Sequence, residues 1–219
     1  MSQNYDLQVA FPRGIKGLIF DCDGVMFDSK AANIGYYNLI LEALGLPRLS
    51  PEDEEYAHMH AWQETLNHVV PRERFVDLPK ARQSIDYCSM VTPMLTPEPG
   101  LCELLEYMKS VGLPAAVHTN RSNSMEYTLN HFGMSHLFDV VMTAGVVAAK
   151  PSPEGIYVIQ KAWQADMQDM AFLGDSELDQ QAARAAGVPF WAYKNSKLDA
   201  DWHVSDFMQV LQALKKLQR

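Results

Sequence analysis

The chain has 219 residues, of which 47% are hydrophobic and 21% are charged, a composition that is ordinary for a globular protein with a sizeable core. Eighteen basic residues against 27 acidic ones give a net charge of −9. Because nucleic acids and anionic membranes bind concentrated positive charge, the composition argues against both as partners. An excess of carboxylates is compatible with bound divalent cations.

The three cysteines, Cys22, Cys88 and Cys102, are far apart in the sequence and form no CxxC pair. This pattern indicates free thiols and a reducing compartment. The N-terminal stretch has no cleavable apolar core, and no apolar run reaches the length of a membrane span. We therefore expect a cytoplasmic protein without a membrane partner.

The first half of the chain predicts one strand followed only by helices. The short apolar run 15–20 is typical of a buried strand. A helix is predicted over 30–44, where Gly45 and Pro47 follow as stop signals. Two more helices are predicted, one over 52–68 with acidic residues in its first turn and one within 79–92.

The segment TPMLTPEPG, residues 92–100, predicts a linker, and strand and helix signals alternate after it. The predicted strands are 114–118, 138–142, 170–173 and 188–193, and the predicted helices are 101–111, 122–132, 153–163, 177–186 and one from about 206. We expect a capping box of Asn123 and Glu126 to begin helix 122–132, and Ser152 with Pro153 to begin helix 153–163.

Alternating strands and helices predict an α/β fold, in which a parallel, Rossmann-like sheet carries helices on both faces. Strand 15–20 belongs to the same sheet, so the helical block is an insertion after the first strand. We expect a core domain of residues 1–28 and 96–219 and an inserted α-helical domain of residues 29–95. Such sheets bind ligands beyond the carboxyl ends of their strands, where the insertion would act as a lid.

Acidic residues follow the carboxyl ends of two predicted strands. Asp21 and Asp23 follow the first strand, and Asp175 and Asp179 follow the fourth. Because the carboxyl ends of parallel strands lie at one edge of a sheet, these side chains are expected to converge. Clustered carboxylates are the ligands that Mg²⁺ prefers in proteins. We therefore predict a Mg²⁺ site of Asp21, Asp175 and Asp179, with a further oxygen near Asp23.

Two other strand ends supply a cation and a hydroxyl. Lys150, after the third predicted strand, would neutralise the remaining negative charge and hold an anion. Thr119, at the end of the second, would hydrogen-bond the same anion. A phosphoryl group suits this set, since its charge is spread over three oxygens in the transition state. Asp21 would attack phosphorus and form an aspartyl phosphate, while Asp23 would protonate the leaving oxygen and then deprotonate water.

Three neighbours of these residues complete the predicted phosphate-binding set. Cys22 lies beside the nucleophile, and Asn120 and Arg121 follow Thr119 directly. For Arg121 two interpretations are equally open: its guanidinium either holds the phosphate or is simply exposed.

The motifs at these positions resemble those of the haloacid dehalogenase superfamily; in chain order they read DCDGV, VHTN, KPSPE and GDSELD. The resemblance covers most of the chain, and the helical insertion is similar to the small C1-type cap of that superfamily. It implies a Mg²⁺-dependent phosphatase or phosphotransferase with Asp21 as nucleophile, similar to the phosphoglycolate phosphatase and β-phosphoglucomutase branch. Asp23 argues against dehalogenases and phosphonatases, which resemble this chain in fold but do not carry that aspartate.

We interpret the chain as a phosphoric monoester hydrolase that acts on a small phosphorylated metabolite, as a monomer or a homodimer. Two alternatives remain open at this point. One is a β-phosphoglucomutase-like phosphomutase that uses the same core residues but retains the phosphoryl group for transfer. The other is a non-catalytic binding protein with the same fold.

Overall fold

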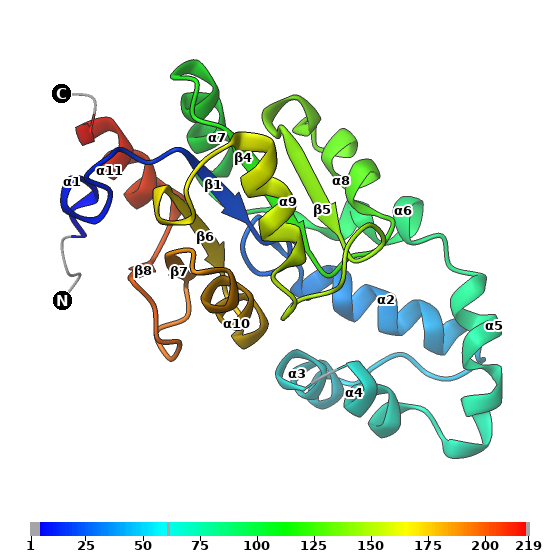
Figure 1. Cartoon of the computed structure of the whole chain (residues 1–219). Coiled ribbons are helices and arrows are strands. Elements are labelled where there is room, and N and C mark those ends of the chain that lie inside the picture. Colours follow the sequence, from blue (N-terminus) through cyan, green and yellow to red (C-terminus); the bar gives the residue numbers. More distant parts are fainter. Residues whose placement is uncertain (1–4, 61, 218–219) are drawn as a thin grey trace. The chain divides into compact units, whose positions relative to one another are not determined.

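The computed structural model describes residues 5–60 and 62–217 and divides the chain into two compact units (Figure 1). The first unit comprises Met1–Phe27 and Pro97–Arg219, and the second comprises Asp28–Thr96. Because the chain leaves the first unit once and returns once, the second unit is an insertion into the first.

The first unit is built on a six-stranded sheet in the order β5-β4-β1-β6-β7-β8. Its strands are β1 (Gly17–Phe20), β4 (Ala115–Thr119), β5 (Val140–Thr143), β6 (Met170–Gly174), β7 (Phe190–Tyr193) and β8 (Trp202–Val204). Neighbouring strands are parallel throughout this sheet, so their carboxyl ends lie at one edge. β1 is central, and Ile19 pairs with Ala116 of β4 and with Phe172 of β6.

Alternating side chains decide which helices cover which face of the sheet. Ile19 packs in a buried cluster with Ile156 of α9 (Glu154–Trp163) and Ala182 of α10 (Glu177–Ala186). The next residue, Phe20, points to the opposite face, where its ring meets that of Phe207 in α11 (Phe207–Leu217). α7 (Leu101–Ser110) packs against α11, so helices cover both faces (Figure 1). The predicted α/β fold with a parallel sheet is confirmed.

Shorter elements complete the first unit: α1 (Leu7–Ala10), α8 (Met125–His131), η3 (Ser135–Leu137) and η4 (Met167–Asp169). The chain passes from the first unit to the second and back at two places, and these two crossings form a separate pair of short strands, β2 (Phe27–Asp28) and β3 (Thr96–Pro97). At the outgoing crossing, the side chain of Asp28 accepts the backbone N–H of Lys30 over 2.9 Å. This bond satisfies one of the free N–H groups at the start of α2.

The second unit consists of helices, which are α2 (Lys30–Ala43), α3 (Pro51–Met59), α4 (Trp62–Val69), η1 (Arg72–Asp77), α5 (Leu78–Gln83), α6 (Tyr87–Met90) and η2 (Thr92–Met94). It has its own buried apolar cluster, in which Ile40 and Leu41 of α2 pack with Leu66 of α4 and Ala81 of α5. Its fold is therefore stabilised from within.

Two predicted helices of the second unit are wrong as single helices. The helix expected over 52–68 is split, because His60 has an extended backbone and ends α3; residue 61 lies outside the described residues. The break allows Trp62, the first residue of α4, to stack on Tyr37 of α2 with ring centres 5.0 Å apart. The helix expected within 79–92 is interrupted before Asp86, whose side chain caps α6 by accepting the N–H of Cys88.

In the first unit, the predicted capping box of Asn123 and Glu126 is wrong. α8 begins after Ser124 without a side-chain cap, and the side-chain Oδ1 of Asn123 accepts the Ser122 hydroxyl instead. α9 begins one residue later than expected, after Pro153. α1 and β8 were not predicted, because they are too short to show a period in the sequence.

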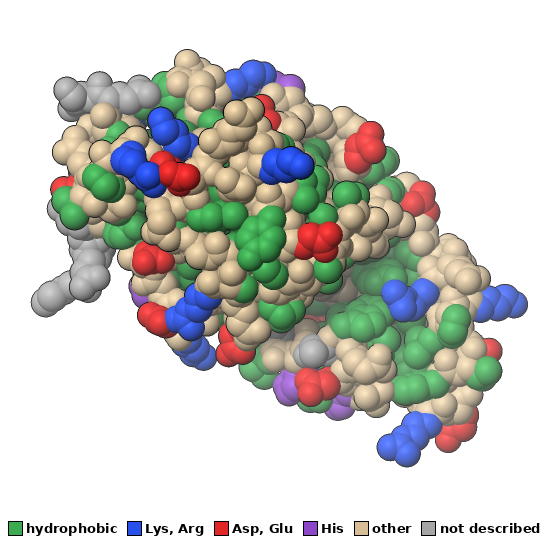
Figure 2. Space-filling model, in the orientation of Figure 1, with side chains coloured by type: hydrophobic (Ala, Val, Ile, Leu, Met, Phe, Trp, Pro, Cys, Tyr) green, Lys and Arg blue, Asp and Glu red, His purple; other side chains and the backbone are tan. Residues whose placement is uncertain are grey.

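Charged side chains of both signs are interspersed on the face that Figure 2 shows. Apolar side chains gather on one side of the second unit in the same view, and the exposed large ones of this unit include Met59, Val76, Met90 and Met94. Within the described part of the chain, no helix combines the length and the apolarity that crossing a bilayer requires.

Candidate active site

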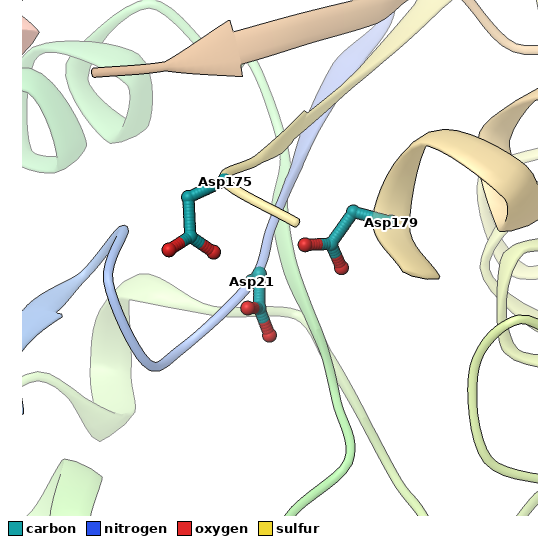
Figure 3. A group of neighbouring side chains, drawn as sticks. All are labelled: Asp21, Asp175 and Asp179. Atoms are coloured by element: carbon teal, nitrogen blue, oxygen red, sulfur yellow. The ribbon is translucent and has the colours of Figure 1, made fainter. Parts of the chain in front are cut away.

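Three carboxylates meet at the carboxyl edge of the parallel sheet (Figure 3). Asp21 directly follows β1, Asp175 directly follows β6, and Asp179 lies in the first turn of α10. One oxygen of each carboxylate lies within 4.8 Å of the other two. β1 and β6 are neighbours, and the Asp21 N–H continues their ladder by donating to the Leu173 carbonyl over 2.9 Å. The sheet itself therefore places the first two acids side by side.

Lys150 lies between two of these acids. Its ammonium Nζ is 2.6 Å from Oδ1 of Asp21 and 2.6 Å from Oδ1 of Asp179. All three residues are buried: the exposed fraction is 6% for Lys150, 7% for Asp21 and 0% for Asp179. Since a charge held away from water needs a partner, the lysine offsets part of the cost of burying the two carboxylates.

The pKa values show that this offset is incomplete. Burial, opposed by Lys150 and reinforced by Asp179, holds the pKa of Asp21 above its usual range. Burial and then the charge of Asp179 raise the pKa of Asp175 to about 6. Burial by itself would lower the pKa of Lys150, but Asp21 and Asp179 raise it, so the ammonium stays charged. Asp21 and Asp175 therefore hold their protons more tightly than free carboxyl groups do, and added positive charge at this place would favour their charged forms.

The residues present fit a divalent cation. A cluster of carboxylate oxygens, all hard ligands, lies where burial and a neighbouring acid disfavour the charged form of Asp175. A bound cation would favour the charged form of Asp175, which burial disfavours. The chemistry of the donor set thus matches a hard divalent cation.

Asp23 is held by Arg121. The guanidinium donates from Nε to Oδ2 over 2.8 Å and from Nη2 to Oδ1 over 2.6 Å. This two-point contact fixes the plane of the carboxylate. The side chain of Arg121 is only 7% exposed, whereas that of Asp23 is 40% exposed. Of the two open interpretations for Arg121, the one in which its guanidinium is simply exposed to solvent is therefore wrong. The guanidinium also donates from Nη1 to the Thr128 hydroxyl over 3.4 Å.

The segment after β4 positions Lys150 as well. Asn120 accepts the backbone N–H of Lys150 over 2.7 Å and donates to its carbonyl over 3.2 Å. Thr119 is 2% exposed, and its hydroxyl oxygen accepts the N–H of Arg121 over 3.2 Å. Two loops that follow adjacent strands are thus joined beside the acids.

The turn that carries Cys22 is tight and buried. Its carbonyl accepts the N–H groups of Met26 and Phe27 at 2.9 and 3.0 Å, and its thiol side chain is fully buried. Gly24, at φ +78°, packs so closely on Asp175 that a Cβ would lie 2.1 Å from the carboxylate. A side chain at position 24 would displace that acid, so this glycine is required by both the backbone and the site.

The orientation of Asp179 was not predicted. Its N–H donates to the Ser176 hydroxyl, and its Oδ2 accepts the N–H and the hydroxyl of Ser176, forming a capping box at the start of α10. This leaves Oδ1 for Lys150. The signal was present in the sequence as a serine three residues before the acid.

We expect the contribution of Asp175 to folding stability to fall as the pH rises from about 4 to about 6 when no divalent cation is present. A carboxyl group whose pKa is higher in the folded than in the unfolded state binds its proton more tightly when folded, so deprotonation favours unfolding. Because Mg²⁺ competes with that proton, it should raise the Tm more above this pH window than below it.

Thermal unfolding in EDTA and in Mg²⁺, measured across this pH range, checks the expectation. Asp175→Asn is the control, because residue 175 then has no proton to lose: it should show a smaller Mg²⁺ effect and a weaker dependence of that effect on pH between about 4 and about 6. A Mg²⁺-induced shift in Tm that is the same at every pH in the wild type would contradict the assignment.

A family model described as haloacid dehalogenase-like hydrolase matches residues 18–193. Phosphoglycolate phosphatase of Rhodobacter capsulatus is 27% identical over 202 residues, which cover 87% of this chain and 91% of that protein. Phosphoglycolate phosphatase of Caulobacter vibrioides is 27% identical and covers 78% and 76% of the two chains. Among solved structures, a HAD-superfamily hydrolase, subfamily IA, variant 1, of Geobacter sulfurreducens is 36% identical over 91% of this chain and 96% of that chain, with a TM-score of 0.83.

Proposed function

This chain belongs to the haloacid dehalogenase-like hydrolases, and from this premise we propose that it hydrolyses a small phosphate monoester through an aspartyl phosphate on Asp21. The observation that carries the proposal is the ammonium of Lys150, which contacts both Asp21 and Asp179 at 2.6 Å beside Asp175. An acid cluster with a buried cation at its centre is suited to stabilise a phosphoryl group in transfer.

In the first half of the reaction, Asp21 attacks phosphorus and the ester oxygen leaves. Lys150 holds Oδ1 of Asp21, so Oδ2 is the oxygen that forms the new bond to phosphorus. Asp23, in its protonated form, gives its proton to the leaving oxygen, and the product departs as an alcohol. Both oxygens of Asp23 accept from Arg121, so one of these two bonds opens when Asp23 carries the proton, and the other keeps the carboxyl group in place.

In the second half, water hydrolyses the aspartyl phosphate. Asp23, now a carboxylate, takes a proton from the water as its oxygen bonds to phosphorus, and the bond between phosphorus and Asp21 breaks. Phosphate leaves, Asp21 is again a carboxylate, and Asp23 is again protonated. The same side chain thus serves as acid and then as base.

We propose that Asp21, Asp175 and Asp179, with an oxygen of Asp23, hold Mg²⁺. When bound, the cation supplies positive charge that offsets the charge of the transferring group. The hydroxyl of Thr119 and the backbone around Cys22 would hold the phosphoryl oxygens, and Asn120 would keep Lys150 in place through its backbone.

We propose that the helical unit Asp28–Thr96 acts as a cap domain, with residues 29–95 as its body. Its closure would exclude bulk water from the reacting groups and select the substrate. Support comes from its insertion directly after the strand that carries the nucleophile.

The relatives named phosphoglycolate phosphatase make 2-phosphoglycolate the first substrate to test. We expect Mg²⁺-dependent phosphate release from at least one member of a panel of 2-phosphoglycolate, sugar phosphates, nucleotides and pyrophosphate. Phosphate release is measured colorimetrically, and sugar-phosphate isomerisation is measured in parallel. Isomerisation without phosphate release would indicate a phosphomutase instead, and activity on no member of the panel would contradict the proposal.

A further inference from the structure

The last residue of β7 and the loop after it, together called loop 193–195, make contacts in two directions. The Tyr193 hydroxyl donates to Oε2 of Glu98 over 3.1 Å, and the Lys194 ammonium donates to the same oxygen over 2.6 Å. The next residue, Asn195, donates from Nδ2 to the backbone carbonyl of Asp175 over 2.8 Å. Three consecutive residues therefore join Glu98 to the acid that follows β6.

Glu98 lies where the chain re-enters the first unit after the helical insertion. Glu98 is 8% exposed, and its backbone N–H donates to the Met26 carbonyl over 2.9 Å. Met26 belongs to the same tight turn as Gly24, which packs against the Asp175 carboxylate. The contacts thus close a ring from the nucleophile turn through Glu98 and Asn195 to Asp175 and back.

The backbone of Lys194 supports a specific role for this loop. Its φ is +51°, in the left-handed region that favours glycine. A glycine would fit this backbone better than a lysine, but it could not make the 2.6 Å bond from the Lys194 ammonium to the mostly buried carboxylate of Glu98.

We propose that Asn195 and Glu98 are positioning residues for the metal ligand Asp175, Asn195 directly and Glu98 through the loop 193–195. The inference rests on the proposed function, because it takes Asp175 as a ligand of the divalent cation. Groups that orient a metal ligand affect metal affinity without touching the metal. Asn195 holds the backbone of Asp175, and Glu98 links that backbone to the point where the helical insertion ends.

The test measures cation binding directly, by titration with Mn²⁺ followed by electron paramagnetic resonance. We expect Asn195→Ala to weaken Mn²⁺ binding about tenfold or more. Glu98→Gln keeps an acceptor for Tyr193 but removes the charge that holds Lys194, so it should weaken binding in the same direction. Because both act through one loop, the double variant should bind Mn²⁺ clearly more tightly than the product of the two single fold-changes predicts.

Asn130→Ala is the matched control. It removes a side-chain bond of similar length, 2.6 Å from the Ser135 hydroxyl, on an exposed part of the same unit, and it should bind Mn²⁺ like the wild type. The Tm in EDTA identifies a variant that fails to fold: if this is Asn195→Ala, Glu98→Gln decides, and if it is Glu98→Gln, Asn195→Ala decides.

The outcomes separate the two proposals. A wild-type protein that binds no Mn²⁺ contradicts the proposed metal site itself. A wild-type protein that binds Mn²⁺, with Asn195→Ala or Glu98→Gln folded and equal to it in affinity, overturns the positioning role. Fully multiplicative effects in the double variant overturn the coupling through loop 193–195.

Discussion

Replacing Asp21 with Asn is expected to reduce phosphate release about 10⁴-fold or more, because an amide oxygen does not form the aspartyl phosphate. The variant should remain folded. Asn has the shape of Asp, its carbonyl oxygen still accepts from Lys150, and Asp179 still pairs with the ammonium at 2.6 Å. Activity and the far-ultraviolet circular dichroism spectrum, measured on the same preparation, separate lost chemistry from lost structure.

Asp23→Asn is the matched comparison, since the same change is made two residues away. We expect a loss of about 10²- to 10⁴-fold in turnover, the usual contribution of a general acid and base. With p-nitrophenyl phosphate, whose leaving group needs no proton, this variant should still form the aspartyl phosphate and release a burst of nitrophenolate. Asp21→Asn should give no burst. A burst from Asp21→Asn, or acid-stable incorporation of phosphate elsewhere, would contradict Asp21 as the nucleophile.

Lys150→Met is expected to lower the free energy of unfolding by about 3–5 kcal/mol at neutral pH. The change removes the ammonium that contacts Asp21 and Asp179, and both carboxylates are buried. One of them can take up a proton to relieve the repulsion, so the loss should be smaller at acidic pH and larger as the pH rises. Phosphate release should fall with it, since the charge beside the phosphoryl group is gone.

Urea unfolding in EDTA at about pH 5 and about pH 8 measures this effect, and Lys161→Met is the control. Lys161 is an exposed lysine of α9, and exposed substitutions of this kind change stability by less than about 0.5 kcal/mol. Equal stability of Lys150→Met and the wild type at both pH values would show that the ammonium does not offset the buried acids.

The sheet and the convergence of its acids were predictable because both follow from local pattern. A buried parallel strand is a short apolar run, as in GLIF and MAFLG, and the parallel order then brings the residues after β1 and β6 to one edge. Asp21 and Asp175 were therefore placed correctly beside each other. The distances from Lys150 were not predictable, because it follows β5 by a loop whose path is fixed by Asn120, directly after the neighbouring strand β4.

The helical unit was less predictable because contacts distant in sequence decide where its helices end. The polar stretch 52–68 has good helix propensity throughout, yet Trp62 stacks on Tyr37 and the helix breaks before it. The pair of Arg121 and Asp23 was equally hidden, since 98 positions separate them. Glu98 and Asn195 carried no motif, and only the folded chain shows that they lie on one path to Asp175.

The central place of β1 also has a consequence for biosynthesis. This strand leaves the ribosome first, but its two neighbours, β4 and β6, begin only at Ala115 and Met170. At ordinary translation speeds, synthesis of the chain between Gly17–Phe20 and β4, the first strand that can pair with it, takes on the order of ten seconds. The helices of Asp28–Thr96 are contiguous and can fold during that interval. The helices of the insertion can therefore form before the sheet that brings Asp21 and Asp175 together is complete.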